Sequence, residues 1–236
     1  MNTVYHKADS RGFANHGWLK SYHSFSFAGY HNPERIHFGA LRVLNDDEVA
    51  GGAGFGKHPH DNMEIISIPL EGDLEHGDDM GNRTVIKQGD VQLMSAGTGV
   101  VHSEKNGQTN APVKFLQIWV FPEKRDIQPR YDQKTFAPAD FQNKLATVVS
   151  PLGQGEGVEI NQQAWFSKGH FDQSTTINYR WHRKENGLYI FVLEGSVTAG
   201  TQVLQRRDGL GIWNTNEIVL KPEAGTQLLL MEIPMN

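Results

Sequence analysis

The feature that most constrains the fold of this chain is the regular alternation of short apolar runs with turn residues. The runs at 38–44, 64–68 and 115–121 are rich in Val, Ile, Leu and Phe, and each is followed closely by Asn, Asp, Gly or Pro. Each run has the length of a strand and is short for a helix. Glycine supplies 25 of the 236 residues, which is above the usual share of ~7%. The pattern predicts an all-β fold, and the length allows one large domain or two medium ones.

Two pairs of potential metal ligands lie within this pattern. His58 and His60 flank Pro59, and His102 comes 42 residues after His60, with Glu104 two positions beyond. In an extended strand, the side chains of residues i and i+2 leave the same face. Two paired strands would therefore bring His58, His60, His102 and Glu104 to one point. Three imidazoles and one carboxylate predict a site for one divalent transition metal ion.

The donor set favours a catalytic metal site over a structural one. Four protein ligands on an octahedral ion leave two positions open for substrate and for dioxygen or water. The alternative is a closed tetrahedral zinc site that only joins two strands. Such sites are usually rich in thiolates, and the chain contains no cysteine.

Four other polar residues are weaker candidates. Counting in twos from His58 along one continuous strand places Glu64 on the face of His60, ~7 Å beyond it. There it could support a ligand, act as a general base, replace a ligand, or lie at the rim without a role. His16 and His23 could be extra ligands, but histidines beside Trp or Phe are more often core or surface residues. His76 lies by a predicted hairpin turn, so we expect it to be exposed and without function.

Composition and charge exclude several classes of protein. The chain has 22 Lys and Arg against 27 Asp and Glu, and the basic residues are scattered, which argues against direct nucleic-acid binding. The glycine-rich segment 51–56 matches neither a dinucleotide fingerprint nor a P-loop. No stretch approaches the ~20 apolar residues of a membrane span, and the N-terminus does not resemble a signal peptide. We therefore expect a soluble, cytoplasmic protein without a membrane partner.

The second half of the chain repeats the first in outline. Leu193-Glu194-Gly195 follows Leu70-Glu71-Gly72 by 123 residues (193 − 70). The same offset applied to the first histidine pair reaches Trp181 and Arg183. The second copy has therefore lost the ligands.

This repeat predicts two domains with different roles. We expect a metal-binding unit at 1–125 and a second unit without metal ligands at 126–236. His170 and His182 remain in the second unit, but neither has a partner pair, so we do not expect them to be ligands. The proline-punctuated segment that starts at Pro122 is predicted to be the linker.

Taken together, the motifs resemble those of the cupin superfamily, and their duplication resembles a bicupin. The more specific resemblance is to the pirin family, and it covers nearly all of the first half. It is carried by the segments Ser10-Arg11-Gly12, His16-Gly17-Trp18-Leu19-Lys20-Ser21, Phe25-Ser26-Phe27-Ala28, Gly56-Lys57-His58-Pro59-His60, Met94-Ser95-Ala96-Gly97-Thr98-Gly99 and His102-Ser103-Glu104. In the second half it depends only on Leu193-Glu194-Gly195 and Asp208-Gly209-Leu210-Gly211.

The resemblance implies an all-β fold of two facing β-barrel (jelly-roll) cupin domains. It also implies an iron-type metal site on His58, His60, His102 and Glu104. Iron is the metal expected first, and nickel, cobalt, copper, manganese and zinc are alternatives that the ligand set also accepts. Some family members are associated with quercetin 2,3-dioxygenase activity and others with binding transcription regulators.

The resulting hypothesis is a metal-dependent dioxygenase of the quercetin 2,3-dioxygenase type. It would bind a small aromatic, flavonol-like substrate, open its heterocycle with O2 and release carbon monoxide, with Glu64 or Glu104 as the catalytic proton acceptor. One alternative is a metal-containing, redox-responsive protein that binds a transcription regulator or another protein partner. A second is a metal-dependent isomerase or hydrolase that uses bound water.

Overall fold

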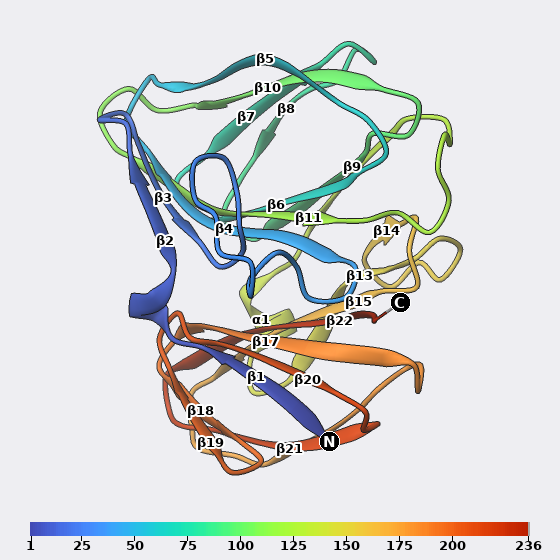
Figure 1. The fold of residues 1–236 in the computed structure, drawn as a ribbon. Coiled ribbons are helices and arrows are strands. Elements are labelled where there is room, and N and C mark those ends of the chain that lie inside the picture. The colour runs from blue at the N-terminus through green and yellow to red at the C-terminus, as the bar shows by residue number, and fades with distance from the viewer. Residues whose placement is uncertain (236) are drawn as a thin grey trace.

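The computed structural model describes residues 1–235, which form four mainly antiparallel β-sheets in four layers (Figure 1). The first half of the chain supplies the upper two layers in this view. Its seven-stranded sheet contains, in spatial order, β12 (Arg130–Thr135), β9 (Asp90–Ser95), β6 (Glu64–Glu71), β11 (Val113–Val120), β4 (Leu41–Val49), β3 (Leu19–His23) and β2 (Gly12–Asn15). Its four-stranded sheet contains β5 (Gly54–His60), β10 (Val100–Asn106), β7 (Leu74–Asp78) and β8 (Arg83–Ile86).

The second half repeats this pair of sheets. Its seven-stranded sheet contains β1 (Asn2–His6), β20 (Gly209–Trp213), β17 (Asn186–Glu194), β22 (Thr226–Pro234), β15 (Trp165–Phe171), β13 (Leu145–Pro151) and β14 (Val158–Ile160), of which β13 and β14 are parallel. Its four-stranded sheet contains β16 (Ile177–Arg180), β21 (Glu217–Pro222), β18 (Ser196–Ala199) and β19 (Gln202–Gln205). The helices of the described part of the chain are a 3-10 turn, η1 (Ala8–Ser10), and one short α-helix, α1 (Pro138–Phe141). Within residues 1–235, no helix is long and apolar enough to cross a membrane.

Two strands cross the predicted division at 125/126. β1 pairs with β20 in the second half, where Figure 1 shows it as a blue strand among red ones. β12 pairs with β9 in the first half, so the expectation that the segment after Pro122 is only a linker is wrong. Pro129 and Pro138 suggested a linker, but they lie just outside β12. An edge strand tolerates proline at its ends, so these prolines are compatible with a strand between them.

The largest apolar cluster lies between the two seven-stranded sheets, which pack face to face. β11 turns Leu116 and Ile118 toward this interface, and β22 turns Leu229 and Met231 toward it from the other side. Alternate residues of each strand face into their own half, as the period of two requires. The two halves therefore share one core.

The interiors of the two halves differ. Fifteen buried apolar residues fill the second half between its two sheets. The first half has only two small apolar clusters in the same place, around Phe115 and around Ile65, with polar side chains between them. Space for a ligand is therefore left in the first half.

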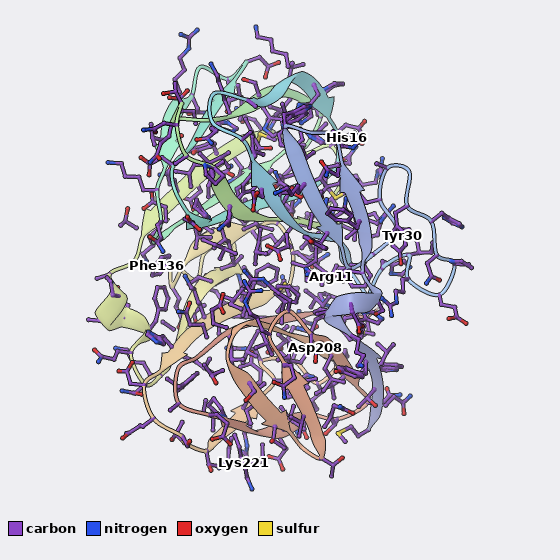
Figure 2. All side chains as sticks on the ribbon, turned by 90° about the vertical axis from the view of Figure 1, so that its left-hand side faces the viewer. Arg11, His16, Tyr30, Phe136, Asp208 and Lys221 are labelled. Atoms are coloured by element: carbon purple, nitrogen blue, oxygen red, sulfur yellow. The ribbon has the colours of Figure 1, made fainter. Side chains whose placement is uncertain are left out.

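The turn-prone residues Asn45, Asp46 and Asp47, which we expected to end the apolar run at 38–44, instead lie inside β4. Their side chains find partners that make a strand acceptable. Asp46 pairs with Arg11 at 3.2 Å and with Arg207 at 2.9 Å, and Asp47 accepts a hydrogen bond from the Ser21 hydroxyl. Arg11 and Asp46 belong to the first half and Arg207 to the second, so this ion-pair network joins them; Figure 2 labels Arg11 near the junction of the two halves.

Candidate metal centre and its cavity

The three predicted histidine ligands come together on the paired strands β5 and β10. His102 lies directly opposite His58, and Val100 lies opposite His60. The three imidazoles each offer a nitrogen, and these atoms lie within 4.8 Å of one another. Their ring centroids are 4.4 to 4.9 Å apart. The i, i+2 geometry predicted from the sequence therefore gives the expected convergence.

The histidines are held in a state that can bind a metal ion. The Nδ1 of His58 is 2.8 Å from the carbonyl oxygen of Gly56, which can only accept, so His58 donates through Nδ1 and leaves Nε2 free. Burial, and then the neighbouring His58, lower the pKa of His60 to about 4. Burial and the three surrounding histidines lower the pKa of His102 to about 2. Neutral imidazoles are the form that metals require.

His102 gives the clearest sign that a group belongs in this site. It is 2% exposed, and neither ring nitrogen has a hydrogen-bond partner within the described chain. A buried, unpaired polar atom costs ~1–3 kcal/mol. A divalent ion bound by the three imidazoles would give one of these two nitrogens a partner, so the residues present fit the metal that the sequence predicts.

Glu104 lies next to the histidines, not among the three nitrogens that converge. The register between β10 and β5 shifts after His102, so that Glu104 lies opposite Phe55. The Glu104 carboxylate accepts hydrogen bonds from Gln117 Nε2 at 3.0 and 2.8 Å and from Ser67 Oγ at 3.0 Å. It is held in one orientation at the cavity wall, and its assignment as the fourth ligand stays a prediction.

Glu64 does not share a face with His60, so the expectation from the sequence is wrong on this point. The strand is not continuous: Asn62 has a positive φ of 46°, and the chain passes there from β5 into β6 of the other sheet. Glu64 is fully buried on the interdomain side, where its carboxylate accepts hydrogen bonds from Ser95 Oγ at 2.7 Å and from the Asn161 N–H at 3.2 Å. Burial raises its pKa. Counting in twos fails at a bend, because the period of two holds only within one strand.

The expectation that His76 is exposed is also wrong. It is 3% exposed, and its ring lies 5.4 Å from that of His102 and 4.9 Å from that of Tyr131. Its Nε2 is 3.0 Å from Asp78 Oδ2. Burial acts to raise the pKa of Asp78, but hydrogen bonds from His76 and Asn82 outweigh it and lower that pKa. The sequence signal was the i, i+2 pair His76 and Asp78, which places both side chains on the inner face of β7.

His58 and His60 lie at the wall of a cavity of about 900 Å³, and His102 is buried beside them. This volume is within the range of small-molecule sites. Its lining is strongly aromatic and includes Phe13, Trp18, Phe27, Tyr30, Phe55 and Trp119. His16 and His23 also line it, although neither belongs to the group of three converging histidines. The cavity suits a flat aromatic compound.

Among residues 126–235, the second half shows no equivalent group of converging histidines. Ile65 and Leu188 are related by the 123-residue offset (188 − 65), and they pair with Trp119 and Glu232 respectively. In the first half, the ring of Trp119 packs against that of His60 with their centroids 4.9 Å apart. At the equivalent position of the second half, Glu232 accepts a hydrogen bond from His182 Nδ1 at 2.8 Å. The remaining donors to Glu232 are Tyr179 Oη at 3.1 Å, the N–H groups of His182 and Arg183 at 3.0 Å, and Asn186 Nδ2 at 3.1 Å. In the second half, the protein's own side chains fill the space that the first half leaves open for a ligand.

Comparisons with known proteins agree with this arrangement. A family model described as Pirin matches residues 5–120, and one described as Quercetinase C-terminal cupin domain matches residues 147–233. A relative from Escherichia coli strain K12 named quercetin 2,3-dioxygenase is 38% identical over 239 residues, with 97% of each chain covered. The chain belongs to the pirin family. A pirin-like protein from Caulobacter vibrioides is 35% identical over 225 residues, which covers 95% of this chain and 96% of that protein.

Solved structures of the pirin family confirm the bicupin fold. The bacterial pirin YhhW from Escherichia coli, in complex with nickel(II), superposes with a TM-score of 0.93 at 37% identity, and both chains are covered completely. Quercetin 2,3-dioxygenase from Acinetobacter baumannii has a TM-score of 0.78 at 20% identity, covering 100% of this chain and 79% of that one, and it supports the fold alone.

Proposed function

We propose that this protein is a metal-dependent dioxygenase of the quercetin 2,3-dioxygenase type, which opens the heterocycle of a flavonol-like substrate with O2 and releases carbon monoxide. The observation that carries the proposal is the convergence of three imidazoles beside an aromatic cavity of about 900 Å³, which two of them line. The name of the Escherichia coli relative supports the reaction class.

His58, His60 and His102 would hold one divalent metal ion, with Glu104 as the fourth ligand. When bound, the ion would supply the positive charge that lowers the pKa of an enol or hydroxyl group of the substrate and makes it electron-rich. Iron is the metal expected first. The nickel(II) complex of the Escherichia coli pirin supports nickel as the leading alternative.

The protein side chains would orient the substrate and receive its proton. Gln117 and Ser67 fix the Glu104 carboxylate, which lines the cavity and is the proton acceptor for the substrate hydroxyl. Phe27 packs edge-on against Trp119 at 5.3 Å, and Trp18 packs edge-on against Phe55 at 5.2 Å. These aromatic pairs would bind the flat rings of the substrate and exclude water from the reacting carbon.

The test is dioxygen uptake with quercetin by protein loaded separately with iron, nickel, cobalt, copper and manganese. We expect uptake that tracks quercetin loss with at least one metal and falls to the protein-free rate in His58→Ala. His170→Ala, the same substitution at a histidine of the second half, is the matched control and should keep full activity. Stoichiometric metal without uptake for any ion would refute the dioxygenase and favour the partner-binding alternative.

A further inference from the structure

A row of polar side chains crosses the inner face of the first seven-stranded sheet. The register places His23 opposite Asn45, Asn45 opposite Gln117, Gln117 opposite Ser67, and Ser67 opposite Gln92. All five are buried, with exposures of 8% or less. Polar groups inside a sheet core are costly unless they have hydrogen-bond partners. Each side chain of the row is therefore expected to have a hydrogen-bond partner.

The side chains at the centre of the row have hydrogen-bond partners, whereas two atoms at its cavity end have none. Gln117 and Ser67 hold Glu104, as described above. In contrast, His23 Nδ1 and Asn45 Oδ1 are buried and have no hydrogen-bond partner among residues 1–235. Both residues line the cavity. The missing partner would therefore come from a molecule in the cavity.

The two unpaired atoms have complementary chemistry. The Asn45 side-chain oxygen only accepts a hydrogen bond. Burial lowers the pKa of His23, so its imidazole is neutral near pH 7 and offers one donor and one acceptor. A phenolic hydroxyl, which donates one hydrogen bond and accepts another, would satisfy both residues.

The surroundings and the spacing identify where on a ligand this hydroxyl would be. The His23 ring packs against Phe27 at 5.3 Å and against Tyr30 at 6.2 Å. Figure 2 shows Tyr30 on the loop that follows β3, and His16 at the far end of the β2–β3 hairpin. Asn45 is one strand and His23 two strands away from Gln117, which corresponds to about 5 and 10 Å. The hydroxyl would therefore be on a different ring from the group that approaches the metal ligands.

We propose that His23 and Asn45 form a subsite for this distant hydroxyl and select flavonol-like substrates that carry one. This inference rests on the proposed function, because it assumes that a flavonol-like compound occupies the cavity. It assigns the selectivity to the polar row at β3 and β4, away from the histidines on β5 and β10.

The test compares the binding of matched flavonols to the nickel-loaded protein under argon, followed by quenching of tryptophan fluorescence. The compounds are 3-hydroxyflavone, 3,7-dihydroxyflavone and 3,4′-dihydroxyflavone. In the wild type, we expect at least one dihydroxy compound to bind about tenfold more tightly than 3-hydroxyflavone, as one well-placed buried hydrogen-bond pair allows. Asn45→Leu and His23→Phe should each reduce this preference to less than about twofold while leaving the affinity for 3-hydroxyflavone within about threefold.

Gln92→Leu is the matched control, since it removes a buried polar group from the same row but outside the cavity lining, and it should keep the wild-type preference. Equal binding of the three compounds by the wild type would overturn the subsite alone, and this comparison needs no variant to fold. A preference that survives both His23→Phe and Asn45→Leu would also overturn it. If none of the compounds binds, the subsite and the proposed function both fail.

Discussion

Replacing Asp47 with asparagine should remove a large pH dependence of stability from this protein. Asp47 lines the cavity, is 5% exposed and accepts a hydrogen bond from Ser21. Burial raises its pKa to about 7, and the nearby carboxylates of Glu104 and Asp46 add to the rise. The unfolded chain has a pKa of ~3.9 for aspartate. The folded protein therefore binds this proton more tightly than the unfolded chain does.

The sign and size follow from that difference. Since the folded pKa is the higher one, the free energy of unfolding is unaffected below pH ~4 and falls as the pH rises to about 7. Three pKa units at ~1.4 kcal/mol each give a total of about 4 kcal/mol, of which ~2.5 kcal/mol falls between pH 5 and pH 8. Asparagine has nearly the same shape, can still accept from Ser21, and does not titrate. The wild type should therefore lose ~2.5 kcal/mol relative to Asp47→Asn over this range.

The assay is urea unfolding of the metal-free wild type and Asp47→Asn at pH 5, 6, 7 and 8. Ser21→Ala serves as a second variant: the Ser21 hydrogen bond lowers the pKa of Asp47, so its removal should extend the loss of stability to higher pH. A difference between wild type and Asp47→Asn that stays constant within ~0.5 kcal/mol across the series would refute the reasoning.

Two further substitutions test whether the metal site depends on the first half of the chain alone. Glu232→Leu leaves several buried donors unpaired, so we expect a loss of ~3–5 kcal/mol in unfolding free energy with unchanged metal content by elemental analysis; loss of metal would show that the second half supports the site. The exposed Glu223→Leu is its control. Glu64→Gln should keep bound metal and turnover, because Glu64 faces the other domain. A folded variant with tenfold lower turnover would show that Glu64 takes part in catalysis.

The two pairs of candidate metal ligands could be found in the sequence because their geometry is local. His58 with His60, and His102 with Glu104, each lie within a single strand, where the period of two fixes which side chains share a face. The apolar runs and glycines likewise predicted the all-β fold, because strand and turn preferences act over a few residues. The loss of ligands from the second half was visible in the repeat, since Trp181 and Arg183 stand at the equivalent positions.

The rest was decided by contacts between segments far apart in the chain. Glu64 moved to the interdomain face because the chain bends at Asn62, and β1 and β12 each joined the opposite half through pairings that no local preference specifies. The sequence alone thus determined the fold class and the converging histidines, through rules that act within one strand. Only the tertiary structure decided the cavity, because its walls come from β2, β3, β4, β5, β10 and β11, which meet through the sheet order and the packing of the sheets.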